Sequence, residues 1–116
     1  MVTSDFAALV QRQLDAYNAH DADGFAACFS DGVQCFRHPD TQPFLQGRAA
    51  LRDYYARERF SIDGLHARLV HRIDFGRRVL DHEHVMGLDP SPREVVAVYE
   101  QGDDGLIAAV SFIAPL

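Results

Sequence analysis

Residues Phe36 to Arg48 read FRHPDTQPFLQGR and are the most informative segment of this chain. It predicts a short strand ending on His38, a segment broken by Pro39 and Pro43, and a helix that begins at Arg48. Places where a strand meets a loop are where a rigid scaffold often presents reactive groups. A histidine there titrates near neutral pH and can serve as acid, base or hydrogen-bond partner. His38 is therefore the first candidate functional residue.

The residues before this stretch predict two helices. Residues 4–19 repeat apolar side chains every three or four positions, and Ser4 or Thr3 can cap the first turn. Gln13 falls on the apolar stripe, an odd place for an amide unless it faces a polar cavity. A second, short helix is expected to end at residues 31–32. The stripe of the first helix consists of Phe6, Leu9, Val10, Leu14 and Tyr17.

The strand from Val33 to His38 has two faces, because successive side chains alternate. One face carries Gln34, Phe36 and His38, and the other carries Val33, Cys35 and Arg37. The third helix runs from Arg48 to about Phe60. Its helical spacing groups Leu51, Tyr54, Tyr55 and Glu58.

The second half of the chain predicts a meander of long strands. The expected strands are 65–75, 78–87, 94–101 and 106–113, joined by turns at 76–77, 88–92 and 102–105. Helices followed by antiparallel strands indicate an α+β domain, with the helices packed on one face of a curved sheet. We expect a single cone-shaped domain over residues 1–116 with a pocket between sheet and helices.

The register of the hairpin at residues 65–87 is open at this point. Strict alternation puts Leu65, Ala67, Leu69, His71 and Ile73 on one face. If His71 pairs with Asp81, Glu83 lies on the same face and the carboxylates stabilise the charged imidazole. A one-residue slip instead groups His71 with His82 and His84. That cluster resembles a metal site only weakly, since no fourth ligand is evident, and we predict no metal.

Composition excludes several classes of protein. The net charge is −6, and all eleven basic residues are arginine, without a basic run, so nucleic acid is not an expected partner. No segment approaches the roughly 20 apolar residues of a membrane span, and the N-terminus lacks the features of a signal peptide, so we expect a cytoplasmic protein. Cys28 and Cys35 have no metal-type spacing and are expected to be reduced, packed thiols.

Several segments together resemble the nuclear transport factor 2-like superfamily, in its ketosteroid isomerase-like and SnoaL-like branch. They are AYNAHDADGF at 16–25, FRHP at 36–39, GRAAL at 47–51, DHEHV at 81–85 and GLI at 105–107. The resemblance covers nearly the whole chain. It implies the cone-shaped fold, a small hydrophobic ligand, no cofactor and a homodimer formed through exposed sheet faces. The superfamily hosts isomerases, cyclases, dehydratases, epoxide hydrolases and non-catalytic binders.

The same resemblance suggests roles for particular residues. His38 sits where ketosteroid isomerases have their aspartate base, and Tyr55 matches a pocket tyrosine of the third helix. Gln13 falls near the oxyanion tyrosine and Ala97 falls at the protonated acid, so the steroid isomerase set is incomplete. We predict His38, Tyr55, His71 and Asp81 as catalytic residues. The predicted ligand-binding residues are Gln13, Tyr17, Phe36, Tyr54, Glu83, Ala97 and Tyr99.

Two functions remain open on the sequence alone. The first is a cofactor-free enzyme that transfers protons on a small apolar carbonyl compound, as in isomerisation, dehydration or cyclisation, with His38 as base. The second is a non-catalytic module for ligand binding or dimerisation, which the missing tyrosine and acid favour.

Overall fold

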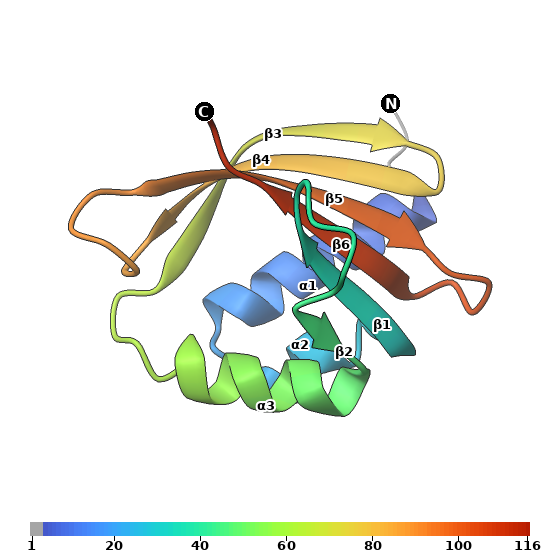
Figure 1. The fold of residues 1–116 in the computed structure, drawn as a ribbon, viewed down its shortest axis with the longest axis horizontal. Helices are drawn as coiled ribbons and strands as arrows, with labels where there is room; N and C mark the ends of the chain where they lie inside the picture. The colour runs from blue at the N-terminus through green and yellow to red at the C-terminus, as the bar shows by residue number, and fades with distance from the viewer. Residues whose placement is uncertain (1–3) are drawn as a thin grey trace.

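The computed structural model describes residues 4–116. Three helices lie beneath one curved sheet of six strands, as the sequence predicts (Figure 1). The helices are α1 (Asp5–Asn18), α2 (Ala22–Ala26) and α3 (Arg48–Glu58). The strands are β1 (Phe29–Arg37), β2 (Leu45–Gln46), β3 (His66–Phe75), β4 (Arg78–Met86), β5 (Arg93–Gln101) and β6 (Ile107–Ile113). Among the described residues, no helix is both long and apolar enough to cross a membrane.

Both early helices begin at a side-chain cap. The Ser4 hydroxyl accepts a hydrogen bond from the Ala7 amide at 3.0 Å, and the Asp21 carboxylate accepts one from the Gly24 amide at 3.0 Å. Thr3, the alternative cap, lies outside the described residues. The predicted end of the second helix at residues 31–32 is wrong, because β1 already begins at Phe29.

The sheet runs in the order β2-β1-β6-β5-β4-β3. The β1–β6 pair is parallel and all the other pairs are antiparallel. The helices cover its concave face, where the core forms around buried aromatic and aliphatic side chains. In this arrangement α1 packs against β3 and β4, and α3 packs against β1 and β2.

A β-bulge interrupts the hairpin of β3 and β4. The register shifts between Leu69 and His71, so Val70 has no residue opposite it. Because side chains alternate along a strand, one extra residue exchanges the two faces for the rest of the strand. The prediction that one face runs unbroken from Leu65 to Ile73 is therefore wrong beyond Leu69.

The bulge also decides between the two predicted registers. Asp81 and Glu83 face the helices, whereas His82 lies on the outer face opposite His71. The alternative that pairs His71 with Asp81 is not found, because Arg72 lies opposite Asp81. The other alternative is found in that His71 lies opposite His82, but Asp81 and Glu83 still face the helices.

Candidate functional site

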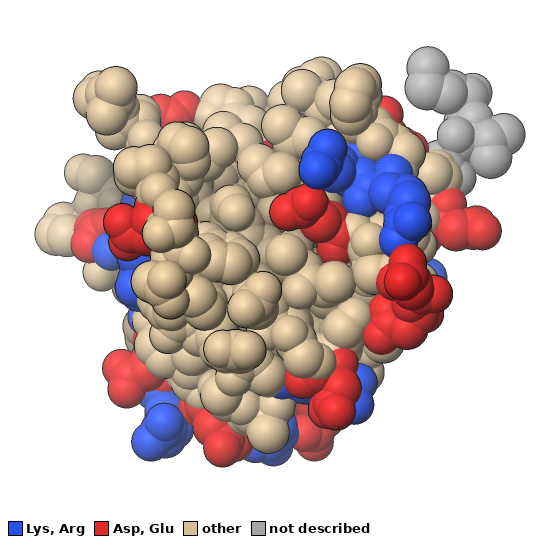
Figure 2. Space-filling model, turned by 45° about the vertical axis from the view of Figure 1, so that its right-hand side comes forward, with Lys and Arg blue, Asp and Glu red and all other residues tan. Residues whose placement is uncertain are grey.

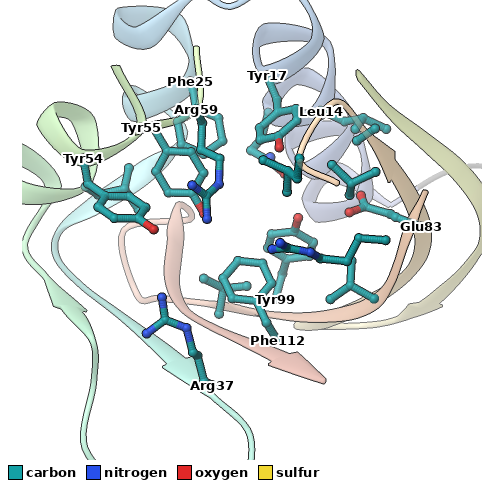
Figure 3. A pocket seen from close by; sticks show the side chains of 18 of the residues that line it. Leu14, Tyr17, Phe25, Arg37, Tyr54, Tyr55, Arg59, Glu83, Tyr99 and Phe112 are labelled. Atoms are coloured by element: carbon teal, nitrogen blue, oxygen red, sulfur yellow. The ribbon is translucent and has the colours of Figure 1, made fainter. Parts of the chain in front are cut away.

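A cavity of about 430 Å³ opens between the helices and the concave face of the sheet. Its walls are mostly apolar and aromatic, with polar groups at a few points, which is the usual make-up of a small-molecule site. Figure 3 shows these side chains converging from α1, α3 and the sheet. The polar or charged residues of the wall are Gln13, Tyr17, Arg37, His38, Tyr54, Tyr55, Arg59, Glu83, Arg93, Glu94 and Tyr99.

Glu83 is a carboxyl group inside this apolar wall. It comes from the middle of β4 and is only 6% exposed. Burial, followed by the nearby charge of Asp81, raises the pKa of Glu83 to about 8, and Arg72 opposes the shift. No group within residues 4–116 donates a hydrogen bond to it, so its oxygens are free for a ligand. A carboxyl group with a pKa close to neutrality can both give and take a proton.

Arg72 does not neutralise Glu83, because Asp81 already occupies it. The Asp81 side chain is 0% exposed, and its two oxygens accept from Arg72 Nε at 2.7 Å and Nη2 at 2.9 Å. Arg72 Nη1 donates to Gln11 Oε1 at 2.9 Å. This bidentate pair is held behind the cavity wall, and Asp81 itself does not line the cavity.

Two tyrosines share the corner of the cavity that holds Glu83. Burial raises the pKa of Tyr17 to about 12, with Arg59 opposing the shift and Glu83 adding to it. Burial, and then the charge of Glu83, raise the pKa of Tyr99 well above its usual value. Both hydroxyls therefore stay protonated at neutral pH, and Figure 3 shows them directed into the open space near Glu83. They can donate hydrogen bonds to a ligand oxygen.

Gln13 adds an unused acceptor to the wall. Its side chain is buried on the α1 stripe, and its Oε1 is a buried polar atom without a hydrogen-bond partner among the described residues. An unpaired buried amide oxygen costs free energy unless a ligand or water satisfies it. This agrees with the expectation that Gln13 faces a polar cavity rather than a dry core.

His38 and Tyr55 also line the cavity, at different depths. His38 follows β1 at the exposed mouth, whereas Tyr55 is buried on α3. Burial raises the pKa of Tyr55 well above its usual value. The ring of Tyr55 packs at 4.7 Å from that of Phe25 and at 6.2 Å from that of Tyr17, between ring centroids. The main contribution of Tyr55 is therefore its ring, which forms part of the aromatic wall of the cavity.

Four predicted site residues lie away from the cavity. Asp81 is sealed behind the wall by Arg72, as described above. His71 is exposed on the outer face of the sheet, because the bulge in β3 turns it outward. Phe36 lies on the face of β1 opposite Val33 and Cys35, and Ala97 is a buried residue across from Asp81. None of the four is part of the cavity wall.

Three arginines of the wall were not predicted from the sequence: Arg37, Arg59 and Arg93. For Arg37 and Arg59, the sequence pattern could have indicated a position at the cavity. Arg37 shares its strand face with Val33 and Cys35, which are both fully buried, so a charge at that position had to sit at the edge of the core. Arg59 caps the C-terminus of α3 four residues after Tyr55, and its amide donates to the Tyr55 carbonyl oxygen at 3.1 Å, so helical spacing brings the two residues together.

The outer face of the sheet carries a second group of titratable residues. His82 Nε2 lies 2.6 Å from Glu94 Oε2, and His84 Nε2 lies 3.6 Å from the same oxygen. The ligating atoms of these three residues all lie within 4.8 Å of one another, a donor set that a divalent cation accepts. Arg68 Nη2 lies 3.0 Å from His84 Nδ1, and its positive charge opposes a cation there. The absence of a metal stays a prediction.

Cys28 and Cys35 are both buried and free, as expected from the sequence. Burial raises the pKa of Cys35 to about 12 and also raises that of Cys28. Thiols in this state are poor nucleophiles.

The comparisons with known proteins agree with this architecture. An uncharacterised cystatin-fold protein from Novosphingobium aromaticivorans superimposes with a TM-score of 0.82 at 23% identity, over 95% of this chain and 98% of that one. A candidate ketosteroid isomerase from Kribbella flavida has a TM-score of 0.78 at 22% identity, over 98% and 80%. A SnoaL-like protein of unknown function from Burkholderia thailandensis has 0.80 at 20% identity, over 99% and 98%.

Identities this low establish the fold alone. No curated protein matches the sequence at a significant level. The sequence itself matches the SnoaL-like domain over residues 10–110, which is most of the chain. This chain therefore belongs to the SnoaL-like domain family and has the nuclear transport factor 2-like α+β fold.

Proposed function

We propose that this protein is a cofactor-independent enzyme that moves a proton on a small, largely apolar carbonyl compound, with Glu83 as the group that carries the proton. The observation that carries this proposal is Glu83 itself. It is a buried carboxyl in an aromatic cavity, without a hydrogen bond from the protein and with a pKa raised to about 8. Structural carboxyl groups are normally paired when buried, as Asp81 is here. Perturbed, unpaired groups in clefts mark functional sites more often.

In this mechanism the ionised fraction of Glu83 removes a proton from the carbon next to the substrate carbonyl. The electron pair of the broken C–H bond moves toward the carbonyl oxygen, which becomes an enolate. The hydroxyls of Tyr17 and Tyr99 donate hydrogen bonds to that oxygen and stabilise its charge. Glu83 then returns the proton to the same or a different carbon. Isomerisation, dehydration and cyclisation all begin with this step.

The residues predicted first from the sequence take supporting roles in the proposal. His38, at the mouth, exchanges protons between the cavity and solvent. Tyr54 and Tyr55 form the aromatic wall that excludes water and shapes the ligand. Ala97 stands where ketosteroid isomerases have their protonated acid. In the proposal Glu83 takes the part of that acid, and it reaches the cavity from the neighbouring strand β4.

The test follows proton exchange rather than a complete reaction, so it needs no natural substrate. 2-Tetralone, an apolar ketone with exchangeable protons next to its carbonyl, is incubated with the protein in D₂O and followed by proton NMR. The wild-type protein is expected to accelerate exchange. Glu83→Gln should lower that acceleration about 10²- to 10⁴-fold, the usual contribution of a general acid–base group. Glu58→Gln, a surface change on α3, is the matched control and should leave exchange unchanged.

A non-catalytic ligand-binding module is the second candidate. The locked Asp81–Arg72 pair and the inert Ala97 favour it, because neither offers a reactive group. In that case 2-tetralone binds saturably without accelerated exchange, and Glu83→Gln binds it as well as the wild type does. That result would contradict the enzyme proposal.

A further inference from the structure

Arg37 and Arg59 differ from the arginines of this acidic chain that pair with carboxylates. The paired arginines are Arg48, Arg52, Arg72, Arg77, Arg78 and Arg93, which each have a carboxylate within 4.0 Å. Arg37 and Arg59 line the cavity, and neither forms a salt bridge to any carboxylate in the described part of the chain. In a protein with a net charge of −6, two unneutralised cations at one cavity are unexpected.

Aromatic rings hold both guanidinium groups in place. Arg37 Cζ lies 3.7 Å from the centroid of the Phe44 ring, and Arg59 Cζ lies 5.4 Å from that of Tyr54. The two rings contact each other edge-on, with centroids 6.3 Å apart. Stacking on a ring face leaves the N–H edge of a guanidinium available, which is the geometry that recognises planar oxyanions.

The two arginines face the same opening. Figure 3 shows Arg37 and Arg59 directed toward the space beside Tyr54, on the side of the cavity away from Glu83. Within residues 4–116, the Arg59 side chain makes one hydrogen bond, which Nη1 donates to the Glu58 carbonyl oxygen at 3.0 Å. Of the other charges on the wall, Arg93 is bound by Asp89 at 2.9 Å, and Glu94 is bound by His82 at 2.6 Å. The free positive charge of the cavity therefore belongs to Arg37 and Arg59.

We propose that the ligand of this cavity carries a carboxylate, which Arg37 and Arg59 bind at the mouth while its apolar body lies against the aromatic wall. This rests on the proposed function in one respect, that the reacting carbonyl of the same ligand reaches Glu83 at the far side. The substrate class is then an apolar keto acid rather than a neutral ketone. A neutral ligand would leave both guanidinium groups without a partner.

The test compares ligands that differ only in charge. 2-Naphthoate and 2-naphthamide have the same shape and nearly the same size, and their dissociation constants are measured by calorimetry. The wild-type protein is expected to bind the acid at least tenfold more tightly than the amide, and added salt should reduce this preference. Smaller acids, benzoate and phenylacetate, extend the series if the naphthyl ring is too large.

Variants of the two arginines make the assignment specific. Arg37→Gln and Arg59→Gln should each weaken binding of the acid about tenfold and leave binding of the amide nearly unchanged. Arg57→Gln is the matched control, because the Arg57 side chain is exposed on α3 and, in the described part of the chain, donates only to the Asp53 carbonyl oxygen. Equal affinity for acid and amide, unchanged acid binding in both variants, or no binding of any acid in the series would overturn the proposal.

The same measurements separate this proposal from the proposed enzymatic function. If the acid binds through the arginines but neither ketone nor keto acid exchanges protons, the anion site stands and the enzyme proposal fails. If 2-tetralone exchanges through Glu83 while the acid shows no preference, the enzyme proposal stands and the anion site fails.

Discussion

At the scale of single residues, the chemistry of this protein depends on how Asp81 and Glu83 differ. They are two residues apart on β4, both are buried, and both face the helices. Arg72 pairs with Asp81 and leaves Glu83 without a partner in the described chain. Asp81 therefore stabilises the fold through its ion pair, whereas Glu83 has a pKa of about 8 and can exchange a proton near neutral pH.

The first prediction concerns stability. The pKa of Glu83 in the folded protein, about 8, lies above its value in the unfolded chain. Below pH of about 4.5 both states hold the proton. Between pH 4.5 and pH 8 Glu83 loses its proton in the unfolded state only. The free energy of unfolding therefore falls by about 1.4 kcal/mol for each pH unit of increase. Glu83→Gln removes this loss and should stabilise the protein by roughly 3 kcal/mol at pH 7.

Urea unfolding from pH 5 to pH 8 measures this effect. Glu58→Gln should keep the wild-type pH dependence, since Glu58 is exposed. If Glu83→Gln is equally or less stable than the wild type at pH 7 to 8, Glu83 is paired in the folded protein and the proposed role weakens. A variant that is both more stable and less active would instead show that the site is maintained at the expense of stability.

The second prediction concerns the pH dependence of exchange. Because the reactive form of Glu83 is the carboxylate, the exchange rate of 2-tetralone should rise with pH and level off above about 8. The rise should disappear in Glu83→Gln. A profile that instead levels off well below neutrality, or that follows the titration of His38 by NMR, would move the base from Glu83 to another residue.

At the scale of elements, the bulge at Val70 determines which side chains of β3 face the helices. If Val70 paired with His82 instead of bulging, His71 would take the position of Arg72, and Asp81 would be buried beside an imidazole. The bulge also lets Asp74 reach α1, where its two oxygens accept from the Ser4 amide at 3.1 Å and hydroxyl at 2.9 Å. The bulge thus allows the edge strand β3 to form hydrogen bonds, through Asp74, with the N-cap of α1.

The third prediction follows from the Arg72–Asp81 pair. Arg72→Met leaves a buried carboxylate without its partner and should cost about 3–5 kcal/mol of unfolding free energy. Arg72→Met combined with Asp81→Asn should recover a large part of that loss, because no charge then stays buried. Thermal and urea unfolding of both variants provide the measurement. If the single and double variants are equally unstable, the loss comes from packing of the arginine stem and not from the unpaired buried charge of Asp81.

At the scale of the whole molecule, one face of the sheet is covered by helices and the other is not. Ile73 and Phe75 on β3 point to the uncovered side, with exposures of 47% and 71%. Ile73 lies opposite Leu80, and Leu80 lies opposite Val98, which makes an apolar row across three strands. Figure 2 shows a broad surface without charged side chains, bordered by acidic and basic ones. The family resemblance predicts a homodimer through such a face.

The fourth prediction tests that dimer. Ile73→Glu puts a charge into the apolar row and should convert a dimer into a monomer in light scattering coupled to size exclusion. Leu116→Glu is the matched control, because Leu116 is an exposed apolar residue beyond the last strand. A wild-type protein that is monomeric at all concentrations, or a dimer that Ile73→Glu leaves intact, would contradict pairing through this face.

Sequence patterns were enough to predict the three helices and the strand meander, because periodic apolar side chains and turn residues act locally. The superfamily followed from the resemblance of particular segments. Helical spacing, strand alternation and the family resemblance also predicted Gln13, Tyr17, Tyr54, Tyr55 and Tyr99 as pocket residues, and all five line the cavity. The inward orientation of Glu83 belonged to one of two registers that the sequence left open. Tertiary structure alone decided the rest. A β-bulge leaves no periodic pattern in the sequence. The sequence therefore could not predict that Arg72, and not His71, lies opposite Asp81. Whether a buried carboxyl is paired or free depends on a partner from another strand, and only the folded sheet shows that Asp81 has one and Glu83 does not.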